Sequence, residues 1–278
     1  MRAVLTIAGS DSSGGAGIEA DIKTIAAHGL FAECAVTALT AQNTTGVFGV
    51  LDVDPDFVEQ QIDVVFDDIR PDAVKVGMVS SPAIIAAIAR ALARNGARHV
   101  VVDPVMVATS GARLIADDAV DALVRELFPL AEVITPNLPE AEALWGAPVS
   151  DEEAAERAAR ALAARCAQAR AALGGAAAED ATAVLVKGGH GLGGPDAAND
   201  LLLDADGTAT WLRAARVDNP NAHGTGCTLS SAIACGLAEG LGVGEAVARA
   251  KAYVAGALGA GLDLGRGSGP LDHMWRYR

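Results

Sequence analysis

The segment AVKVGMVSSPAIIAAIARALARNGARHVVVDP, residues 73–104, predicts a strand, a helix and a second strand in succession. Its two short apolar runs, Ala73–Val76 and Val100–Val102, lack the regular polar alternation of half-exposed strands, which is typical of strands buried on both faces. Between them, Ser81-Pro82 begins an Ala/Ile-rich helix and Asn95-Gly96 ends it. Serine suits the N-cap, proline the first turn, and glycine the position after the last turn. The segment therefore predicts a parallel sheet covered by helices on both faces.

The alternation of short apolar runs and helical patterns extends in both directions. The expected strands are Ala3–Ile7, Val133–Thr135, Val184–Val186, and the pair Leu201–Leu203 and Thr208–Leu212, which flanks the hairpin signal Asp206-Gly207. The expected helices begin near Ile18 and cover Asp117–Leu127, Asp151 to about Leu173, Gly226–Gly240 and Val243–Ala260. No composition break or internal repeat divides the chain. We therefore expect one α/β domain over residues 1–278, with a central mostly parallel sheet between two layers of helices.

Charge and composition exclude several classes of partner. The chain has 278 residues, of which 51% are hydrophobic, and a formal net charge of -14. Such a surface repels nucleic acid backbones and anionic lipid, so neither partner is expected. The four cysteines (Cys34, Cys166, Cys227 and Cys235) form no CxxC pair and no zinc cluster, which fits a reducing compartment. The first apolar run is too short for a signal peptide, and a cytoplasmic location is expected.

A glycine-rich loop, GSDSSGGAG at residues 9–17, follows the first expected strand. Gly15, Gly17 and Ala20 match the GxGxxA pattern of dinucleotide-binding sites, although a flexible turn has the same composition. The strand ends near Ile7, well before Gly15, which disfavours the dinucleotide interpretation. A loop of this kind at the carboxyl end of a strand still predicts a ligand site.

Two polar segments have both a structural and a functional interpretation. Residues 41–46, AQNTTG, suit a capped turn, but the carboxamide of Gln42 also offers a donor and an acceptor together, which suits an aminopyrimidine edge. Asp103-Pro104 ends a buried strand. The proline favours extended backbone at Asp103, so the carboxylate is expected either to point into the crevice or simply to end the strand in a turn.

The segment TPNLPE at residues 135–140 predicts the start of a helix. Asn137 suits the N-cap, Pro139 the first turn, and Glu140 the positive end of the helix dipole. These roles explain the residues almost completely. The functional alternative is that Asn137 and Glu140 face the cleft and hold Mg²⁺ through water.

The densest local signal is AHGTGCT, residues 222–228, at the start of an apolar helix. Two glycines let the backbone turn its N–H groups toward one point, and the helix N-terminus adds positive potential. Such a site stabilises the negative oxygens of a transferring phosphoryl group, whereas the alternative is an ordinary tight turn. Cys227 falls in the first helical turn, where thiol pKa values fall; a buried, inert thiol is the competing interpretation. No Walker A or protein-kinase signature is present, so ATP would need a different fold.

Taken in chain order, these segments resemble the hydroxymethylpyrimidine kinase branch of the ribokinase-like superfamily. The resemblance covers nearly the whole chain, and its matching stretches are IAGSDSSGGAG (7–17), ADIKT (20–24), AQNT (41–44), KVGM (75–78), DPVM (103–106), ITPNLPE (134–140), KGGH (187–190) and HGTGCT (223–228). It implies a homodimer that uses ATP and Mg²⁺. The implied reaction is phosphorylation of 4-amino-5-hydroxymethyl-2-methylpyrimidine and then of its monophosphate.

The resemblance also assigns roles to individual residues. The implied pyrimidine pocket consists of Gly9, Gln42, Met78 and Val105, with Asp21 nearby. The implied ATP and magnesium residues are Asn137 and Lys187 on the ATP side, with Asp103 and Glu140 at the metal. The implied anion hole consists of Gly224, Thr225 and Gly226, followed by Cys227 where most sugar kinases of the superfamily carry aspartate.

The chain departs from the branch at three places, and two other functions stay open. Ala112 and Ala222 stand where the branch often has Asp and Thr, and residues 174–180 look inserted. A pyridoxal or pyridoxine kinase is one alternative, because both substrates are six-membered heteroaromatic rings with a hydroxymethyl arm. A non-catalytic vitamin-precursor-binding protein is the other, although it would not need the Gly224–Cys227 anion hole.

Overall fold

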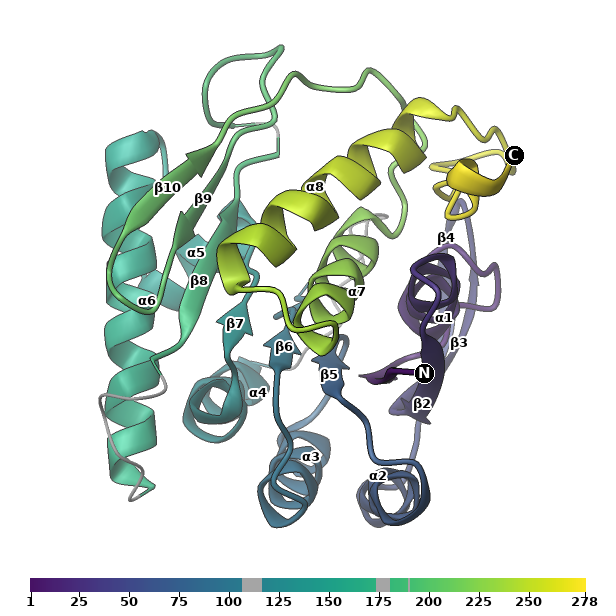
Figure 1. The fold of residues 1–278 in the computed structure, drawn as a ribbon, viewed down its shortest axis with the longest axis vertical. Helices are drawn as coiled ribbons and strands as arrows, with labels where there is room; N and C mark the ends of the chain where they lie inside the picture. Colours follow the sequence, from purple (N-terminus) through teal and green to yellow (C-terminus); the bar gives the residue numbers. More distant parts are fainter. Residues whose placement is uncertain (107–116, 174–180, 190) are drawn as a thin grey trace.

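An eight-stranded sheet runs through the middle of the computed structural model, which describes residues 1–106, 117–173, 181–189 and 191–278. The strand order is β10-β9-β8-β7-β6-β5-β1-β2; β9 is antiparallel to both of its neighbours, and the other pairs are parallel (Figure 1). The strands are β1 Ala3–Ala8, β2 Phe31–Val36, β5 Ala73–Val76, β6 Val100–Val102, β7 Val133–Ile134, β8 Ala183–Lys187, β9 Asp200–Leu203 and β10 Ala209–Leu212. The predicted mostly parallel sheet is confirmed.

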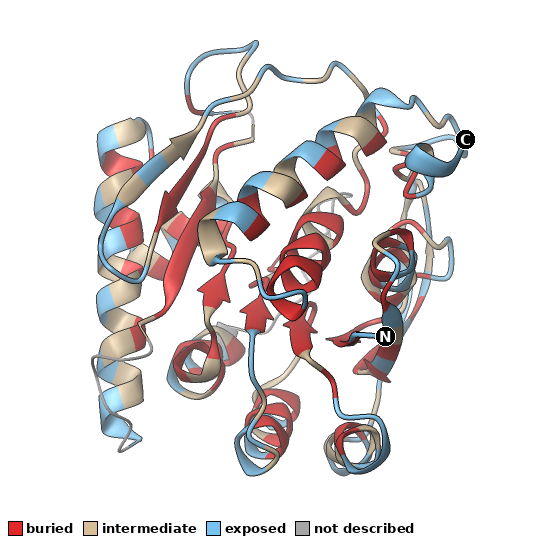
Figure 2. Cartoon of the chain, viewed as in Figure 1, coloured by how far each residue is buried: buried red, intermediate tan, exposed pale blue. Residues whose placement is uncertain are grey.

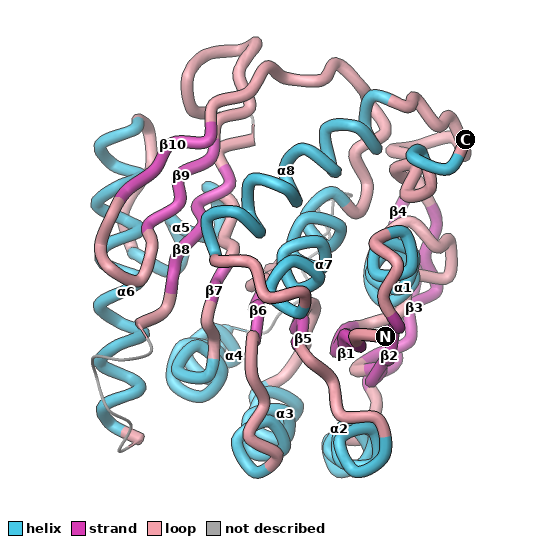
Figure 3. Tube along the Cα trace, in the orientation of Figure 1, coloured by secondary structure: helices cyan, strands magenta, loops and turns pink. Residues whose placement is uncertain are grey.

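Helices cover both faces of this sheet (Figure 3). One face carries α1 (Gly17–Ala27), α7 (Thr225–Ala238) and α8 (Val243–Gly259). The other face carries α2 (Pro55–Asp68), α3 (Pro82–Arg94), α4 (Asp117–Ala122), α5 (Leu138–Trp145) and α6 (Glu152–Ala172). No helix in the described part of the chain is both long and apolar enough to cross a membrane.

Strands buried on both faces explain the unalternated apolar runs. In β6, Val101 packs in the core beneath α7 and α8, while Val100 and Val102 pack in the core beneath α3. Successive side chains point to opposite faces of a strand, so a strand covered on both faces is apolar at most positions. Figure 2 shows the central strands and the inward faces of the helices as buried.

Several elements lie where local sequence patterns were weak. The edge strand β2, the separate hairpin of β3 (Ala38–Asn43) and β4 (Gly46–Asp52), and helix α2 were not predicted. The hairpin contributes no strand to the main sheet, and its residues are largely exposed, so it lacks the pattern of a buried strand. The polar stretch at residues 41–46 contains the end of β3, the two-residue turn Thr44-Thr45 and the first residue of β4. The helix expected over Asp117–Leu127 exists, but a π-helical turn, Leu123–Leu127, replaces its second half. The departures at Ala112 and residues 174–180 lie outside the described residues.

Glu33 on β2 is a buried carboxyl group whose protonation is expected to affect the stability of the fold. Its side chain is nearly buried, and its Oε2 atom has no hydrogen-bond partner in the described structure. Burial, and then the negative charge of Asp72, raise the pKa of Glu33 to about 7. The folded protein therefore holds this proton more tightly than the unfolded chain, and the stability that it contributes is lost as pH rises through the window from the ordinary pKa to about 7.

We expect Glu33→Gln to increase the free energy of unfolding by about 1–3 kcal/mol at pH 8 and to change it little at pH 4.5. Urea unfolding at both pH values measures this. Glu59→Gln is the control of opposite sign, because hydrogen bonds from Arg94 and Arg90 lower the pKa of Glu59. A Glu33→Gln protein that is no more stable at pH 8 than at pH 4.5, relative to the unsubstituted chain, would contradict the prediction.

Candidate active site

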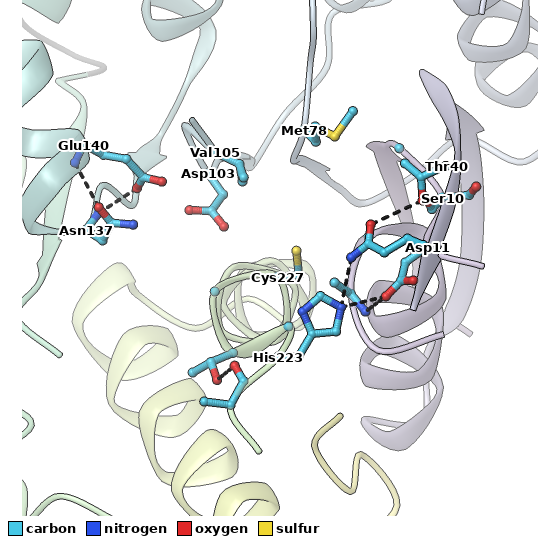
Figure 4. A pocket seen from close by; sticks show the side chains of 18 of the residues that line it. Ser10, Asp11, Thr40, Met78, Asp103, Val105, Asn137, Glu140, His223 and Cys227 are labelled. Carbon is cyan, nitrogen blue, oxygen red and sulfur yellow. Dashed lines mark hydrogen bonds and ion pairs between the residues drawn. The ribbon is translucent and has the colours of Figure 1, made fainter. Parts of the chain in front are cut away.

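The loops at the carboxyl ends of the parallel strands surround a cavity of about 230 Å³, which the start of α7 closes on one side (Figure 4). Parallel strands that end at one edge bring distant segments of sequence together, and ligands bind there. The cavity lining is Gly9, Ser10, Asp11, Ala16, Gly17, Thr40, Gln42, Met78, Asp103, Val105, Asn137, Glu140, Lys187, Ala222, His223, Gly224, Thr225, Gly226 and Cys227. Every residue that the sequence proposed for the site lies in this lining, except Asp21.

Asp21, which the resemblance puts near the pyrimidine pocket, lies behind the cavity wall and does not line it. Its carboxylate is fully buried, pairs with the Lys75 ammonium at 2.7 Å, and accepts hydrogen bonds from Thr6 (2.6 Å) and Ser231 (2.7 Å). Burial alone would lower the pKa of Lys75, but Asp21 and other acidic groups outweigh it and raise that pKa, so the lysine is charged. Asp21 thus ties β1, β5, α1 and α7 together beneath the site. Its helical spacing from the buried Ile18 and Ile25 could have indicated this position.

Asp11 organises the glycine-rich loop. Its Oδ1 accepts from the backbone N–H and the hydroxyl of Ser13, and its Oδ2 accepts from the backbone N–H groups of Gly15 and Ala16 and lies 2.8 Å from His223 Nε2. Burial works to raise the pKa of Asp11, but the hydrogen bonds from His223 and Ser13 prevail and hold it well below its usual range. The loop N–H groups therefore point at Asp11, which disfavours the dinucleotide-binding interpretation.

The start of α7 lies against this loop. Gly224 has φ of +83°, and a Cβ there would lie 1.9 Å from the carbonyl oxygen of Gly15. Only glycine combines that conformation with that approach. Gly226 lies beyond it in the first turn of α7, whose N–H groups have no intrahelical acceptor and therefore suit an anion. A Cβ on Gly226 would lie 3.3 Å from Asp103 Oδ2 and 3.4 Å from Lys187 Nζ, so glycine keeps the space between helix and charges open.

A second group of charged residues lines the end of the cavity opposite the glycine-rich loop. Lys187 Nζ lies 2.7 Å from Asp103 Oδ1 and 4.0 Å from Glu140 Oε2. Asn137 is the N-cap of α5, as predicted, and its reciprocal hydrogen bonds with Glu140 form a capping box. Burial raises the pKa of Glu140 to about 7; Lys187 opposes that rise and Asp103 adds to it. The two carboxylates therefore face one ammonium, and this end of the cavity favours an additional cation.

Of the two interpretations of Cys227, the structure favours the buried thiol over the one with a lowered pKa. Its position in the first turn of α7 predicted a lowered pKa, but burial raises the pKa of Cys227 to about 11, against the opposing effect of Lys75. The removal of the thiolate from water outweighs the helix dipole here. The resting thiol is therefore protonated at neutral pH.

Seven lining residues were not assigned a role by sequence reasoning, and three of them, Asp11, Thr40 and His223, have side chains that hydrogen-bond within the site. Asp11 precedes Ser13 and Gly15 in a pattern typical of a side chain that caps its own loop, and His223 directly precedes the glycine pair. Both signals were present in the sequence. Their common contact was not, because it joins residues more than two hundred positions apart.

The sheet has a crevice at the carboxyl ends of its strands, and this crevice contains a helix start that suits an anion together with buried charges. Such an arrangement is typical of ribokinase-like small-molecule kinases. Within that class, the chain belongs to the phosphomethylpyrimidine kinase family, whose profile matches residues 11–272. It is thus a kinase, as the sequence predicted, and the non-catalytic alternative is set aside.

Similar proteins support this assignment. A hydroxymethylpyrimidine/phosphomethylpyrimidine kinase from Rhizobium meliloti is 51% identical over 98% of this chain and 97% of its own length. The protein of the same name from Escherichia coli is 41% identical over 97% of this chain and 96% of its own length. Among solved structures, the ADP complex of Bacillus subtilis pyridoxal kinase matches with a TM-score of 0.87 and 34% identity, over 100% of this chain and 99% of its own. The phosphomethylpyrimidine kinase of Clostridium difficile matches with a TM-score of 0.76 and 41% identity, over 92% and 98%.

Proposed function

We propose that this kinase transfers the γ-phosphoryl group of ATP to the hydroxymethyl of 4-amino-5-hydroxymethyl-2-methylpyrimidine, and then phosphorylates the monophosphate to the diphosphate, for thiamine biosynthesis. The observation that carries the proposal is that one cavity joins the Gln42 carboxamide to the Gly224–Cys227 turn. The first can read a heteroaromatic edge, and the second can hold a phosphoryl group. The names of the similar kinases support the same substrate.

The apolar part of the cavity suits a flat ring. Gly9, Met78 and Val105 line it, and a Cβ on Gly9 would lie 3.2 Å from the Met78 side chain. A side chain at residue 9 would therefore press on Met78 and narrow this part of the cavity. At the other end, Asn137 and Lys187 are proposed to contact the nucleotide, and the lysine ammonium matches the charge of a transferring phosphoryl group.

Magnesium fits the charges of this site. Asp103 and Glu140 supply hard carboxylate oxygens, and Lys187 neutralises only one of their two charges. Mg²⁺ is commonly held by one or two carboxylates together with substrate phosphates and water. When bound, it would neutralise the developing charge on the phosphate oxygens. Asp103 and Glu140 are therefore the proposed metal residues, and the Gly226 backbone leaves space for phosphates beside them.

The proposal is tested by mass spectrometry. The protein is incubated with ATP, Mg²⁺ and the pyrimidine alcohol, and we expect the monophosphate to form first and the diphosphate to follow. Folded protein that yields no phosphorylated pyrimidine would refute it. Pyridoxal is assayed in parallel, because the pyridoxal kinases of Bacillus subtilis and Staphylococcus aureus are similar in structure, and a slower side activity on pyridoxal is the second proposal.

Gln42 distinguishes the two substrates. Its carboxamide can donate to the ring nitrogen and accept from the amino group of the pyrimidine, whereas pyridoxal has no such edge. We expect Gln42→Leu to raise the KM for the aminopyrimidine about tenfold or more and to change pyridoxal turnover much less. The kcat/KM of each substrate and the melting temperature are measured on the same variant. If both substrates lose activity alike, Gln42 only supports the hairpin turn.

We propose a homodimer that pairs the β3–β4 hairpins of two chains, in the cytoplasm as the sequence predicts. Phe48 and Leu51 on β4 are 71% and 67% exposed, and Leu39 and Val50 are about half exposed. A two-stranded hairpin with apolar side chains in water is marginally stable unless another surface covers it. A second copy would bury the same residues on both sides.

We expect Phe48→Glu to convert the dimer to a monomer, because two like charges would meet at the centre of the covered surface. Sedimentation velocity at several protein concentrations measures the mass. Leu173→Glu, at an equally exposed leucine after α6, is the matched control and should leave the mass unchanged. A Phe48→Glu protein with the mass of the unsubstituted chain would show that the hairpins do not pair.

A further inference from the structure

The Asp11 carboxylate accepts hydrogen bonds on both of its oxygens. Four N–H or O–H groups of its own loop donate to its two oxygens, and the pKa of Asp11 is held well below its usual range. An ionised carboxylate has no hydrogen to donate. The 2.8 Å contact between His223 Nε2 and Asp11 Oδ2 therefore requires a hydrogen on Nε2, whether the imidazole is neutral or charged (Figure 4).

His223 and Thr40 decide how the Gln42 carboxamide is turned. The structure assigns the nitrogen to the end 3.2 Å from His223 Nε2 and the oxygen to the end 3.3 Å from Thr40 Oγ1. The oxygen and nitrogen of a carboxamide have nearly the same shape, so hydrogen bonding decides which is which. A nitrogen beside His223 would place two donors face to face. The single hydroxyl hydrogen of Thr40 is already donated to the carbonyl oxygen of Ser10 at 2.8 Å.

Both neighbours thus demand the same arrangement. The Gln42 oxygen then faces His223 and shares its single Nε2–H with Asp11 as a second, longer acceptor. The Gln42 nitrogen faces Thr40 and donates to its hydroxyl oxygen, which reverses the assignment of the two amide atoms in the structure. We infer that Asp11, His223 and Thr40 together lock the Gln42 carboxamide in this orientation, and thereby determine the direction in which the pyrimidine binds. Asp11 and His223 are positioning residues that act through Gln42, and the inference rests on the proposed pyrimidine substrate.

The orientation of the Gln42 carboxamide determines where the hydroxymethyl group of the substrate lies. Its remaining acceptor position lies on the His223 side and its remaining donor position on the Thr40 side. The amino group of the substrate must then lie toward His223 and the ring nitrogen toward Thr40. The hydroxymethyl group is the next substituent after the amino group, so it lies on the His223 side, where Gly224–Cys227 line the same cavity. The opposite amide orientation would turn the hydroxymethyl group away from the anion hole.

The same arrangement rejects a close analogue. In the 4-oxo analogue, the ring nitrogen carries a hydrogen and donates, and the exocyclic oxygen accepts. The order of donor and acceptor along this edge is therefore the reverse of that in the amino substrate. The locked amide can bind this edge only with the ring turned over, and the hydroxymethyl group then points toward Thr40. We therefore expect kcat/KM for the amino substrate to exceed that for the oxo analogue by about a hundredfold or more, because a polar pocket built for one edge rejects its reverse.

Nuclear magnetic resonance tests the first step without any assay of activity. The protein is labelled with ¹⁵N-histidine, and His223→Gln identifies the His223 signals by their loss. We expect Nε2 of His223 to carry a hydrogen in the protein without substrate. An unprotonated Nε2 would overturn the inference. Because this measurement involves no substrate, its result stands apart from success or failure of the proposed reaction.

Substitutions at both ends of the amide test the second step. Thr40→Val and His223→Leu each free one end, and each should lower the amino-to-oxo ratio of kcat/KM about tenfold. Thr40→Ser keeps the hydroxyl and His223→Gln keeps a donor, so these conservative variants should retain most of the ratio. Damage to the fold alone would lower both substrates equally. An unchanged ratio in both Thr40→Val and His223→Leu would overturn the inference, even with Nε2 protonated.

Discussion

Gly224→Ala is expected to lower kcat/KM by about 10²–10³-fold, the loss that follows removal of one fixed donor from an oxyanion-binding site. A Cβ at this position would lie 1.9 Å from the Gly15 carbonyl oxygen, and the residue has a left-handed φ of +83°. The loop that carries Gly15 and the turn before α7 must therefore separate. That movement displaces the first-turn N–H groups of α7 from the place where the phosphoryl group is transferred, so kcat should fall more than the affinity for either substrate.

The control for this prediction is another glycine at the start of a helix. Gly242 is the N-cap of α8, has φ of -67°, and has open space where a Cβ would lie. Gly242→Ala should leave kcat/KM nearly unchanged. Steady-state kinetics and nucleotide binding by calorimetry are compared for the two variants. If Gly224→Ala turns over as fast as Gly242→Ala, the close approach of the two loops is not required for phosphoryl transfer.

Local patterns predicted most of the main sheet, because its order follows from properties that neighbouring residues share. Buried parallel strands such as Val100–Val102 are apolar throughout, and the helix at residues 82–94 carries its own start and stop signals. The hairpin of β3 and β4 has neither property. Its apolar residues are exposed in the single chain, so no buried face imposes a pattern that could be read from the sequence.

The sequence predicted which residues lie at the site better than it predicted their protonation and contacts. The ordered motifs located Asp103, Lys187 and the Gly224–Cys227 turn correctly in one cavity. The protonation of Cys227 and the contacts of Asp21 were not predictable in the same way. The first depends on the burial of the thiol, and the second on Lys75 from β5, and no local pattern near either residue reveals these surroundings. A helix dipole is a local property, whereas desolvation depends on everything packed around a group.

Cys227→Ala is expected to lower kcat by about 10²-fold, at the low end of the contribution of a general base. The transition state of phosphoryl transfer is loose, so fixed charge and positioning matter more than a strong base. Because burial raises the pKa of Cys227 to about 11, the thiolate that can accept the hydroxyl proton is scarce at pH 7 and increases as pH rises. We therefore expect kcat/KM of the unsubstituted enzyme to rise between pH 7 and pH 9, since the base form increases about tenfold per pH unit below its pKa.

Cys227→Asp separates proton acceptance from the other contributions of the thiol. A carboxylate is already ionised at pH 7, so this variant should turn over faster than Cys227→Ala and should lose the rise of kcat/KM between pH 7 and pH 9. Cys235→Ala is the structural control, because Cys235 is fully buried on the same helix and does not line the cavity. It should lower the melting temperature without changing the pH profile. Nucleotide binding should survive in all three variants. Equal turnover by Cys227→Ala and the unsubstituted enzyme, over the whole pH range, would show that the thiol is a spectator and that the α7 N–H groups and Lys187 carry the reaction without it.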